Sequence, residues 1–193
     1  GAADIIRRHN SFLLASHVRP DGDCLGSMMS LYHGLKHLGK KAAAYNASPL
    51  GEKWAFVPGI EAVKDTLPDW QPEMTIFVDC GSPDRVEEDF DPPGLYLNID
   101  HHLTNARFGD YNYIDIETCA VGEQIFFLLK ALDVPLTRDI AAAIYLSMMT
   151  DTGGFRYSNT SPRALRIAGD LAETGIDISE IAQAVYETRT PEE

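Results

Sequence analysis

Short apolar runs alternate along the chain with longer stretches of helical periodicity. Five runs have the length and composition of buried strands: residues 11–16, 41–45, 74–78, 95–99 and 111–116. Apolar residues at helical spacing predict six helices, at about 3–9, 25–38, 119–132, 138–149, 162–173 and 178–187. Strands that alternate with helices are typical of parallel sheets. We therefore predict an α/β fold: a doubly wound, mainly parallel sheet with helices on both faces, followed by a C-terminal helical segment.

Two segments lack a clear pattern. Residues 46–73 are rich in proline and glycine, and we expect irregular structure there with short helices at most. Residues 188–193 are polar, and we expect them to begin a linker. With 193 residues, the chain has the length of one domain.

Charge and composition narrow the partners. The net charge of −13 argues against binding long nucleic acid by charge alone, but small phosphorylated substrates fit if bound cations reverse the local sign. No apolar stretch approaches the roughly 20 residues that cross a bilayer, so we expect no membrane partner. The chain has three cysteines, Cys24, Cys80 and Cys119, an odd number at spacings that do not match a zinc site. This pattern favours reduced thiols in a cytoplasmic protein.

Acidic residues and histidines follow the apolar runs at four places: His17, Asp21 and Asp23; Asp79; Asp100, His101 and His102; and Asp151. The first three places follow predicted strands, whose carboxyl ends share one edge of a parallel sheet. Each acid alone is more simply explained as a helix cap or a solvated loop residue. Their recurrence at several strand ends is better explained by bound divalent cations. Crowded carboxylates repel one another, and such cations relieve that repulsion.

The mixture of ligand types indicates which metal and which chemistry. Carboxylates with a few imidazoles suit Mn²⁺ or Mg²⁺ better than a thiolate zinc site does. Two such ions about 4 Å apart can activate water and clamp the oxygens of an in-line displacement. The residues therefore predict hydrolysis of a phosphoester or a phosphoanhydride.

The order of these clusters resembles the four motifs of the DHH phosphoesterase superfamily, over about residues 11–159. The segment from His17 to Ser27, HVRPDGDCLGS, is most similar to the branch of bacterial nanoRNases and pAp phosphatases, relatives of the RecJ exonuclease. Family II inorganic pyrophosphatases share the framework. Their first motif resembles Pro-Asp-Thr-Asp-Ser, however, where this chain has Pro-Asp-Gly-Asp at residues 20–23.

The resemblance implies a role for each residue of the clusters. One metal ion falls to His17, Asp21 and Asp79, and a second ion falls to Asp23, Asp79, His101 and Asp151, so that Asp79 bridges the pair. Mn²⁺ is the expected ion, with Mg²⁺ and Co²⁺ as alternatives. His102 is expected to face the scissile phosphate, and Asp100 is expected to orient a histidine.

The implied reaction is hydrolysis of short oligoribonucleotides or of 3′-phosphoadenosine 5′-phosphate by a hydroxide that two metal ions activate. A pyrophosphatase-like enzyme, a cyclic-dinucleotide phosphodiesterase and an idle nucleotide-binding module on the same fold stay as alternatives. The resemblance makes residues 1–187 the DHH catalytic domain and residues 188–193 the start of a linker to an absent C-terminal substrate-binding domain. Nothing here resembles that domain's Gly-Gly-Gly-His motif, so a lone catalytic domain stays as the alternative. A homodimer is compatible with this reading.

Several other residues carry weaker signals. Arg156 could contact a phosphate or pair with a surface acid, and Ser27, at the start of a helix, could contact substrate. His33 and His37 are better explained by a partly exposed helix face than by a metal pair. Cys24 and Cys80 are better explained as small core residues than as ligands.

Overall fold

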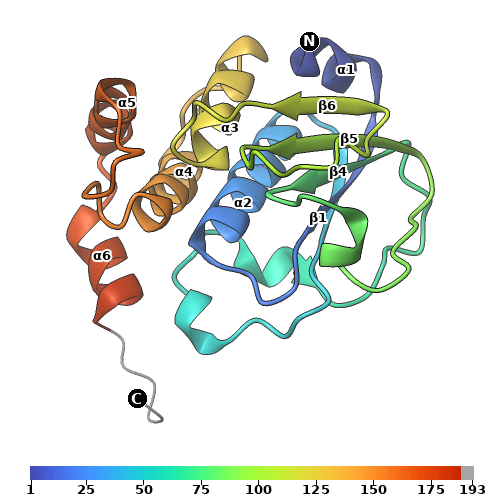
Figure 1. The fold of residues 1–193 in the computed structure, drawn as a ribbon, viewed down its shortest axis with the longest axis horizontal. Coiled ribbons are helices and arrows are strands. Elements are labelled where there is room, and N and C mark those ends of the chain that lie inside the picture. The colour runs from blue at the N-terminus through green and yellow to red at the C-terminus, as the bar shows by residue number, and fades with distance from the viewer. Residues whose placement is uncertain (188–193) are drawn as a thin grey trace.

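The computed structural model describes residues 1–187, which form one sheet with helices packed around it (Figure 1). The strand order is β3-β2-β1-β4-β5-β6, and every neighbouring pair is parallel. The strands are β1 (Ser11–Ser16), β2 (Lys41–Tyr45), β3 (Val63–Lys64), β4 (Met74–Val78), β5 (Leu95–Asp100) and β6 (Tyr111–Ile114). The predicted parallel sheet is confirmed. The short β3, within the unpatterned segment, was not predicted, and residues 188–193 lie outside the described part.

The strand order reverses between β1 and β4, because β2 and β3 lie on one side of β1 and the later strands lie on the other. In the register, Ser16 is opposite Val78, and Val78 is opposite Ile99. The residues that follow these three positions therefore meet at one edge of the sheet. A reversal of this kind opens a crevice beyond the carboxyl ends of the two central strands, where open α/β sheets bind ligands.

The helices are α1 (Ala2–Arg8), α2 (Gly22–His37), α3 (Val121–Ala131), α4 (Arg138–Asp151), α5 (Pro162–Glu173) and α6 (Ile178–Tyr186). All six were predicted, but α2 begins three residues earlier than expected. Its N-cap is Asp21, whose carboxylate accepts the Cys24 backbone N–H at 3.0 Å. Asp23 therefore lies in the first turn of the helix, whereas the sequence suggested a loop.

The two faces of the sheet are covered differently. Alternation along β1 sends Phe12 and Leu14 into the larger core, to which α1 to α4 contribute, and sends Leu13 and Ala15 to the other side. Helix α4 packs on α2 and α3, and α5 packs on α4 (Figure 1). The predicted α/β class is thus confirmed, but the α-helices of the described residues gather over one face and not over both as predicted, because the other face is covered by the aromatic cluster described below.

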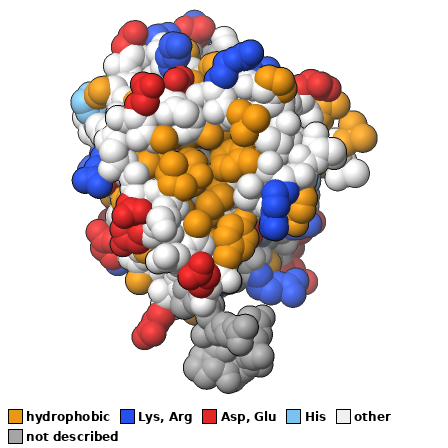
Figure 2. All heavy atoms as spheres, turned by 90° about the vertical axis from the view of Figure 1, so that its left-hand side faces the viewer, with side chains coloured by type: hydrophobic (Ala, Val, Ile, Leu, Met, Phe, Trp, Pro, Cys, Tyr) orange, Lys and Arg blue, Asp and Glu red, His pale blue; other side chains and the backbone are white. Residues whose placement is uncertain are grey.

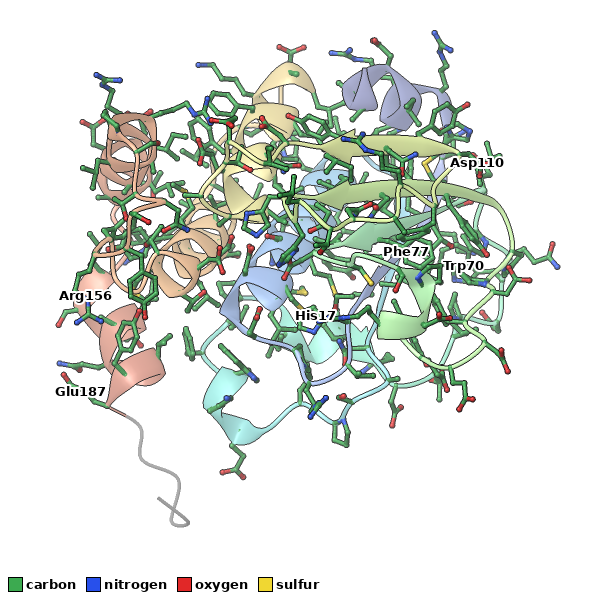
Figure 3. All side chains as sticks on the ribbon, in the orientation of Figure 1. His17, Trp70, Phe77, Asp110, Arg156 and Glu187 are labelled. Carbon is green, nitrogen blue, oxygen red and sulfur yellow. The ribbon has the colours of Figure 1, made fainter. Side chains whose placement is uncertain are left out.

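Aromatic rings form the smaller core on the second face. The Phe77 ring packs edge-on against Tyr96 and Phe108, with ring centroids 5.0 and 4.9 Å away, and also meets Phe90 (Figure 3). Within the described residues, this cluster contains no α-helical side chain. Its cover comes from the segment that begins with the 3₁₀ helix η3 (Pro83–Arg85). The same segment follows the carboxyl end of β4, at the edge of the sheet where β1, β4 and β5 end together.

Close contact between α2 and α4 depends on glycine. A Cβ atom at Gly26 would lie 2.3 Å from the Ala143 carbonyl oxygen, and one at Gly22 would lie 2.4 Å from the Thr150 side chain. Gly22 has no left-handed backbone, so its role is this close approach and not an unusual backbone conformation. The contact brings the amino end of α2 against the carboxyl end of α4, which carries Asp151.

The outer helices leave apolar side chains in solvent. Figure 2 shows hydrophobic side chains gathered on the face of the molecule that α5 and α6 help to form. Exposed apolar residues in this region are Tyr157, Leu165, Ile178 and Tyr186. None of the helices in the described chain is both long enough and apolar enough to cross a bilayer.

We predict that Gly26→Ala lowers the free energy of unfolding by roughly 2 kcal/mol, because backbone atoms of α4 occupy the place of the new methyl group. Gly169→Ala is the matched control: this glycine lies within α5, and a Cβ there meets nothing within 4 Å. The control should raise stability by roughly 0.5–1 kcal/mol. Urea unfolding of both variants checks the prediction, and equal stabilities would show that α2 and α4 tolerate a wider separation.

Candidate metal centre

The six predicted ligands converge at the carboxyl edge of β1, β4 and β5. His17 follows β1, Asp79 follows β4, and His101 follows β5; the rest come from the α2 amino end and the α4 carboxyl end. His17 Nε2 lies 3.5 Å from Asp79 Oδ2 and 3.9 Å from Asp21 Oδ2. His101 Nε2 lies 3.5 Å from Asp23 Oδ2, 3.6 Å from Asp151 Oδ2 and 4.0 Å from Asp79 Oδ1. Two half-sites therefore share Asp79.

His17 and His101 are both oriented by backbone carbonyl groups. His17 Nδ1 lies 2.9 Å from the carbonyl oxygen of Val18, and His101 Nδ1 lies 3.3 Å from that of Thr118. A proton on each Nδ1 satisfies these contacts and leaves each Nε2 lone pair facing the carboxylates. Hydrogen bonds of this kind fix the tautomer and the ring orientation of histidines that bind metal.

Asp79 occupies an unusual position for a charged residue. Its backbone has a φ of +54°, in the left-handed region, directly after β4. The side chain is only 5% exposed, and its Oδ1 atom has no hydrogen-bond partner among the described residues. An isolated buried carboxylate oxygen is energetically costly unless a cation or a donor compensates it. Asp79 Oδ1 thus lies 3.5 Å from His102 Nδ1 and 4.0 Å from His101 Nε2 without accepting a hydrogen bond from either.

The Asp23 carboxylate is buried against the amino end of α3. The Val121 backbone N–H reaches both of its oxygens, at 3.2 and 3.0 Å, and the hydroxyl groups of Ser147 and Ser27 donate to Oδ1 at 2.5 and 2.9 Å. Burial, followed by repulsion from Asp79 and Asp151, raises the pKa of Asp23 well above its ordinary value. A cation held at this point would reverse that shift.

His102 lies at the outer side of the cluster and is half exposed. Its Nδ1 atom is 2.7 Å from Asp100 Oδ1, and this hydrogen bond raises the pKa of His102 to about 9. Asp100 is fully buried and is itself held by Asn105 Nδ2, at 2.5 Å from Oδ2. The Asn105 amide also donates to Asn98 Oδ1 at 2.7 Å. The imidazole is therefore fixed by a chain of polar groups and keeps Nε2 free.

The turn that precedes α3 supports the half-site of His101 and Asp23. It supplies the Thr118 carbonyl and leads to the first residue of α3, Val121, whose N–H is described above. Buried Glu123 accepts the Cys119 N–H at 2.7 Å and pairs with Arg163 of α5. This support, together with Ser147, Asn98 and the role of Asn105, was not predicted from the sequence. A signal was present for two of them, since Ser147 and Asn98 are polar positions inside otherwise apolar runs.

The two residues predicted to bind substrate, Ser27 and Arg156, lie in different parts of the structure. Ser27 is fully buried behind Asp23, which argues against contact with substrate and makes it a support for that carboxylate. Arg156 is exposed, and its Nε donates to the Gly153 carbonyl oxygen at 2.6 Å. In Figure 3 it lies beside α6 and Glu187, separated from His17 by α4. In this structure Ser27 reaches the cluster only through its hydrogen bond to Asp23, and Arg156 makes its contact away from the cluster.

The donor set fits divalent metal ions. Ligand atoms of Asp23, His101 and Asp151 lie within 4.8 Å of one another, and Asp79 forms such a group with His101 and His102. A third group contains His17, Asp21 and the thiol of Cys24. Burial raises the pKa of Cys24 well above its ordinary value, so the thiol keeps its proton and is a poor ligand. The strongest sign of a cation site is the buried Asp79 oxygen that accepts no hydrogen bond among the described residues.

The chain is similar to several known proteins. The bifunctional oligoribonuclease and PAP phosphatase NrnA of Thermus thermophilus is 37% identical over 169 residues, covering 87% of this chain and 51% of that protein. A probable manganese-dependent inorganic pyrophosphatase of Streptococcus mutans is 25% identical over 190 residues, or 94% and 61% of the two chains. An exopolyphosphatase-related protein from Bacteroides fragilis superimposes with a TM-score of 0.88 at 27% identity, covering 98% and 60%.

These matches extend over most of the chain but only part of each relative. The chain spans about half the length of the Thermus thermophilus protein. Residues 11–148, which include the first three clusters, match the DHH family, N-terminal domain. The chain therefore belongs to the DHH family and carries its N-terminal domain.

Proposed function

We propose that this chain is the catalytic part of a phosphoesterase that uses two divalent metal ions and acts on short oligoribonucleotides or on 3′-phosphoadenosine 5′-phosphate. The observation that carries the proposal is the position of Asp79, buried between two half-sites with Oδ1 near His101 but without a hydrogen bond among the described residues. The name of the Thermus thermophilus relative, an oligoribonuclease and PAP phosphatase, supports this class of substrate.

His17, Asp21 and Asp79 would hold one ion, and Asp23, Asp79, His101 and Asp151 would hold the other. Mn²⁺ is the proposed ion: oxygen ligands with imidazole suit it, and the pyrophosphatase relative is named as manganese-dependent. When bound, the ions lower the pKa of water and neutralise charge on the phosphate oxygens. The protein's own part is to hold the ligands in place before substrate arrives.

His102 is the proposed proton donor. Its Nδ1 proton is held by Asp100, and Nε2–H remains available to the substrate. As the bond from phosphorus to the leaving oxygen breaks, that proton can pass to the oxygen, so that an alcohol leaves instead of an alkoxide. Asp100 then stabilises the orientation of the neutral ring, and solvent returns the proton to the exposed imidazole.

A phosphoanhydride is the second candidate substrate. The similarity to a probable inorganic pyrophosphatase favours it, although the first motif contains Gly22 where pyrophosphatases have threonine. Cyclic dinucleotides stay as a further alternative. An idle nucleotide-binding module fits poorly, because a site that has lost its activity usually loses a ligand and all six proposed ligands are present.

Location and assembly stay predictions. The three cysteines are buried and free, which fits the predicted reducing cytoplasm without testing it. The homodimer, and a C-terminal substrate-binding domain beyond a linker at 188–193, likewise stay predictions.

We predict that Asp79→Asn weakens Mn²⁺ binding on the order of 10²-fold or more and abolishes Mn²⁺-dependent hydrolysis of a diribonucleotide, because the bridging charge is lost. Asp84→Asn is the matched control, since this aspartate is exposed on η3 and makes the same change of charge. Calorimetry gives the Mn²⁺ affinity, and product formation gives the rate. Full activity in Asp79→Asn would refute the proposed function.

We predict that His102→Gln leaves Mn²⁺ affinity unchanged and slows hydrolysis on the order of 10²-fold or more, as loss of a positioned proton donor does. His37→Gln, on the exposed side of α2, should change neither quantity. The same calorimetry and kinetics decide the outcome. If His102→Gln removes one Mn²⁺, the roles of the two neighbouring histidines are exchanged and His101 becomes the candidate donor.

A further inference from the structure

A cavity of about 430 Å³ lies at the carboxyl ends of β2 and β3, and β2 is the neighbour of β1, which His17 follows. Asn46 directly follows β2, and Lys64 is the last residue of β3. The 3₁₀ helices η1 (Glu52–Trp54) and η2 (Ile60–Ala62) complete its wall. The cavity thus occupies the same edge of the sheet as the cluster, on the side of β1 away from β4.

Polar contacts tie this cavity to the metal centre. Asn46 is almost fully buried, and its side-chain amide donates to the His17 carbonyl oxygen at 2.9 Å and to Ser16 Oγ at 3.0 Å. Ser48 accepts the Arg19 backbone N–H at 2.7 Å. Neighbouring strands lie about 4.8 Å apart, so the cavity begins roughly 5–10 Å from His17. A ribose can bridge a gap of that size between a phosphate and its base.

The chemistry of the lining suits a nucleobase. Four of the residues that line it are large and apolar: Leu50, Trp54, Ile60 and Val63. Glu52, Glu61, Asp65 and Lys64 line it as well. This surplus of negative charge disfavours a second phosphate, whereas carboxylates accept hydrogen bonds from the exocyclic amino groups and ring N–H groups of bases. Concave sites with an apolar floor and a few polar groups are typical of small-molecule binding.

We propose that this cavity binds the base of a nucleotide whose phosphate lies at the metal centre. The proposal rests on the function proposed above for the cluster and adds a specificity site to it. It assigns the recognition of a nucleotide, as distinct from a simple phosphate, to residues 46–65.

The two tryptophans of the chain provide a direct test. Trp54 lines the cavity, and Trp70 does not, so Trp70→Phe leaves one fluorescent reporter at the proposed site. AMP, titrated in the presence of Mn²⁺, should change the Trp54 fluorescence in a saturable manner. Ribose 5-phosphate carries the same phosphate without a base and should give at least a tenfold weaker response.

Filling the cavity should abolish that difference. Gly51 lines it with an ordinary φ of −71°, and a Cβ there meets nothing within 4 Å. In the Trp70→Phe background, Gly51→Phe should weaken AMP binding at least tenfold, and so should Ala55→Phe at a second lining position. Gly169→Phe places the same ring on open α5 surface and should leave AMP binding unchanged. Urea unfolding confirms that all three variants remain folded.

The outcomes separate the base site from the metal chemistry. Equal responses to AMP and ribose 5-phosphate, or unchanged AMP affinity in both filled variants, would overturn the base site even if Mn²⁺-dependent hydrolysis is observed. A base-dependent response that the filled variants lose would support the base site even if no ester is hydrolysed, in which case the proposed function fails alone. In the filled variants, hydrolysis of bis(p-nitrophenyl) phosphate should stay unchanged, because that ester has no nucleobase.

Discussion

Mutual repulsion among carboxylates is the constraint on which this structure depends. Four aspartates meet at one edge of the sheet, and two of them, Asp23 and Asp79, are almost completely buried. Burial and repulsion from its neighbours raise the pKa of Asp23. The protein meets part of this energetic cost with hydrogen bonds from the α3 amino end and from serine hydroxyls. Asp79 Oδ1 accepts no hydrogen bond among the described residues, which leaves it available to a cation.

Packing far from the ligands determines whether this edge can form. The topology brings the ends of β1, β4 and β5 together. Asp151, however, lies at the end of α4, which follows α3 and not one of these strands. It reaches the cluster because glycines in α2 allow α4 to approach within backbone contact. The turn before α3, held through Glu123 and Arg163, completes the support from the same side.

The sequence predicted the parallel sheet, the six helices and the residues of the cluster, because each depends on local periodicity or on residue type at a strand end. It did not predict the support of the cluster. Ser147 and Val121 donate hydrogen bonds to Asp23, although each lies more than 90 residues away from it in sequence. Periodicity carries no information about such contacts. For the same reason Ser27 was misread: its position near a helix start suggested an anion site, whereas tertiary packing buries it behind Asp23.

The most direct test of this account is the number of metal ions at the shared aspartate. Crystals of the chain grown with Mn²⁺ should show two anomalous scattering peaks on either side of Asp79, roughly 4 Å apart. The His17 side and the His101 side should each hold one. A single peak, with the Asp79 carboxylate remote from it, would contradict the central claim that carboxylate crowding at this edge exists to hold two bridged cations.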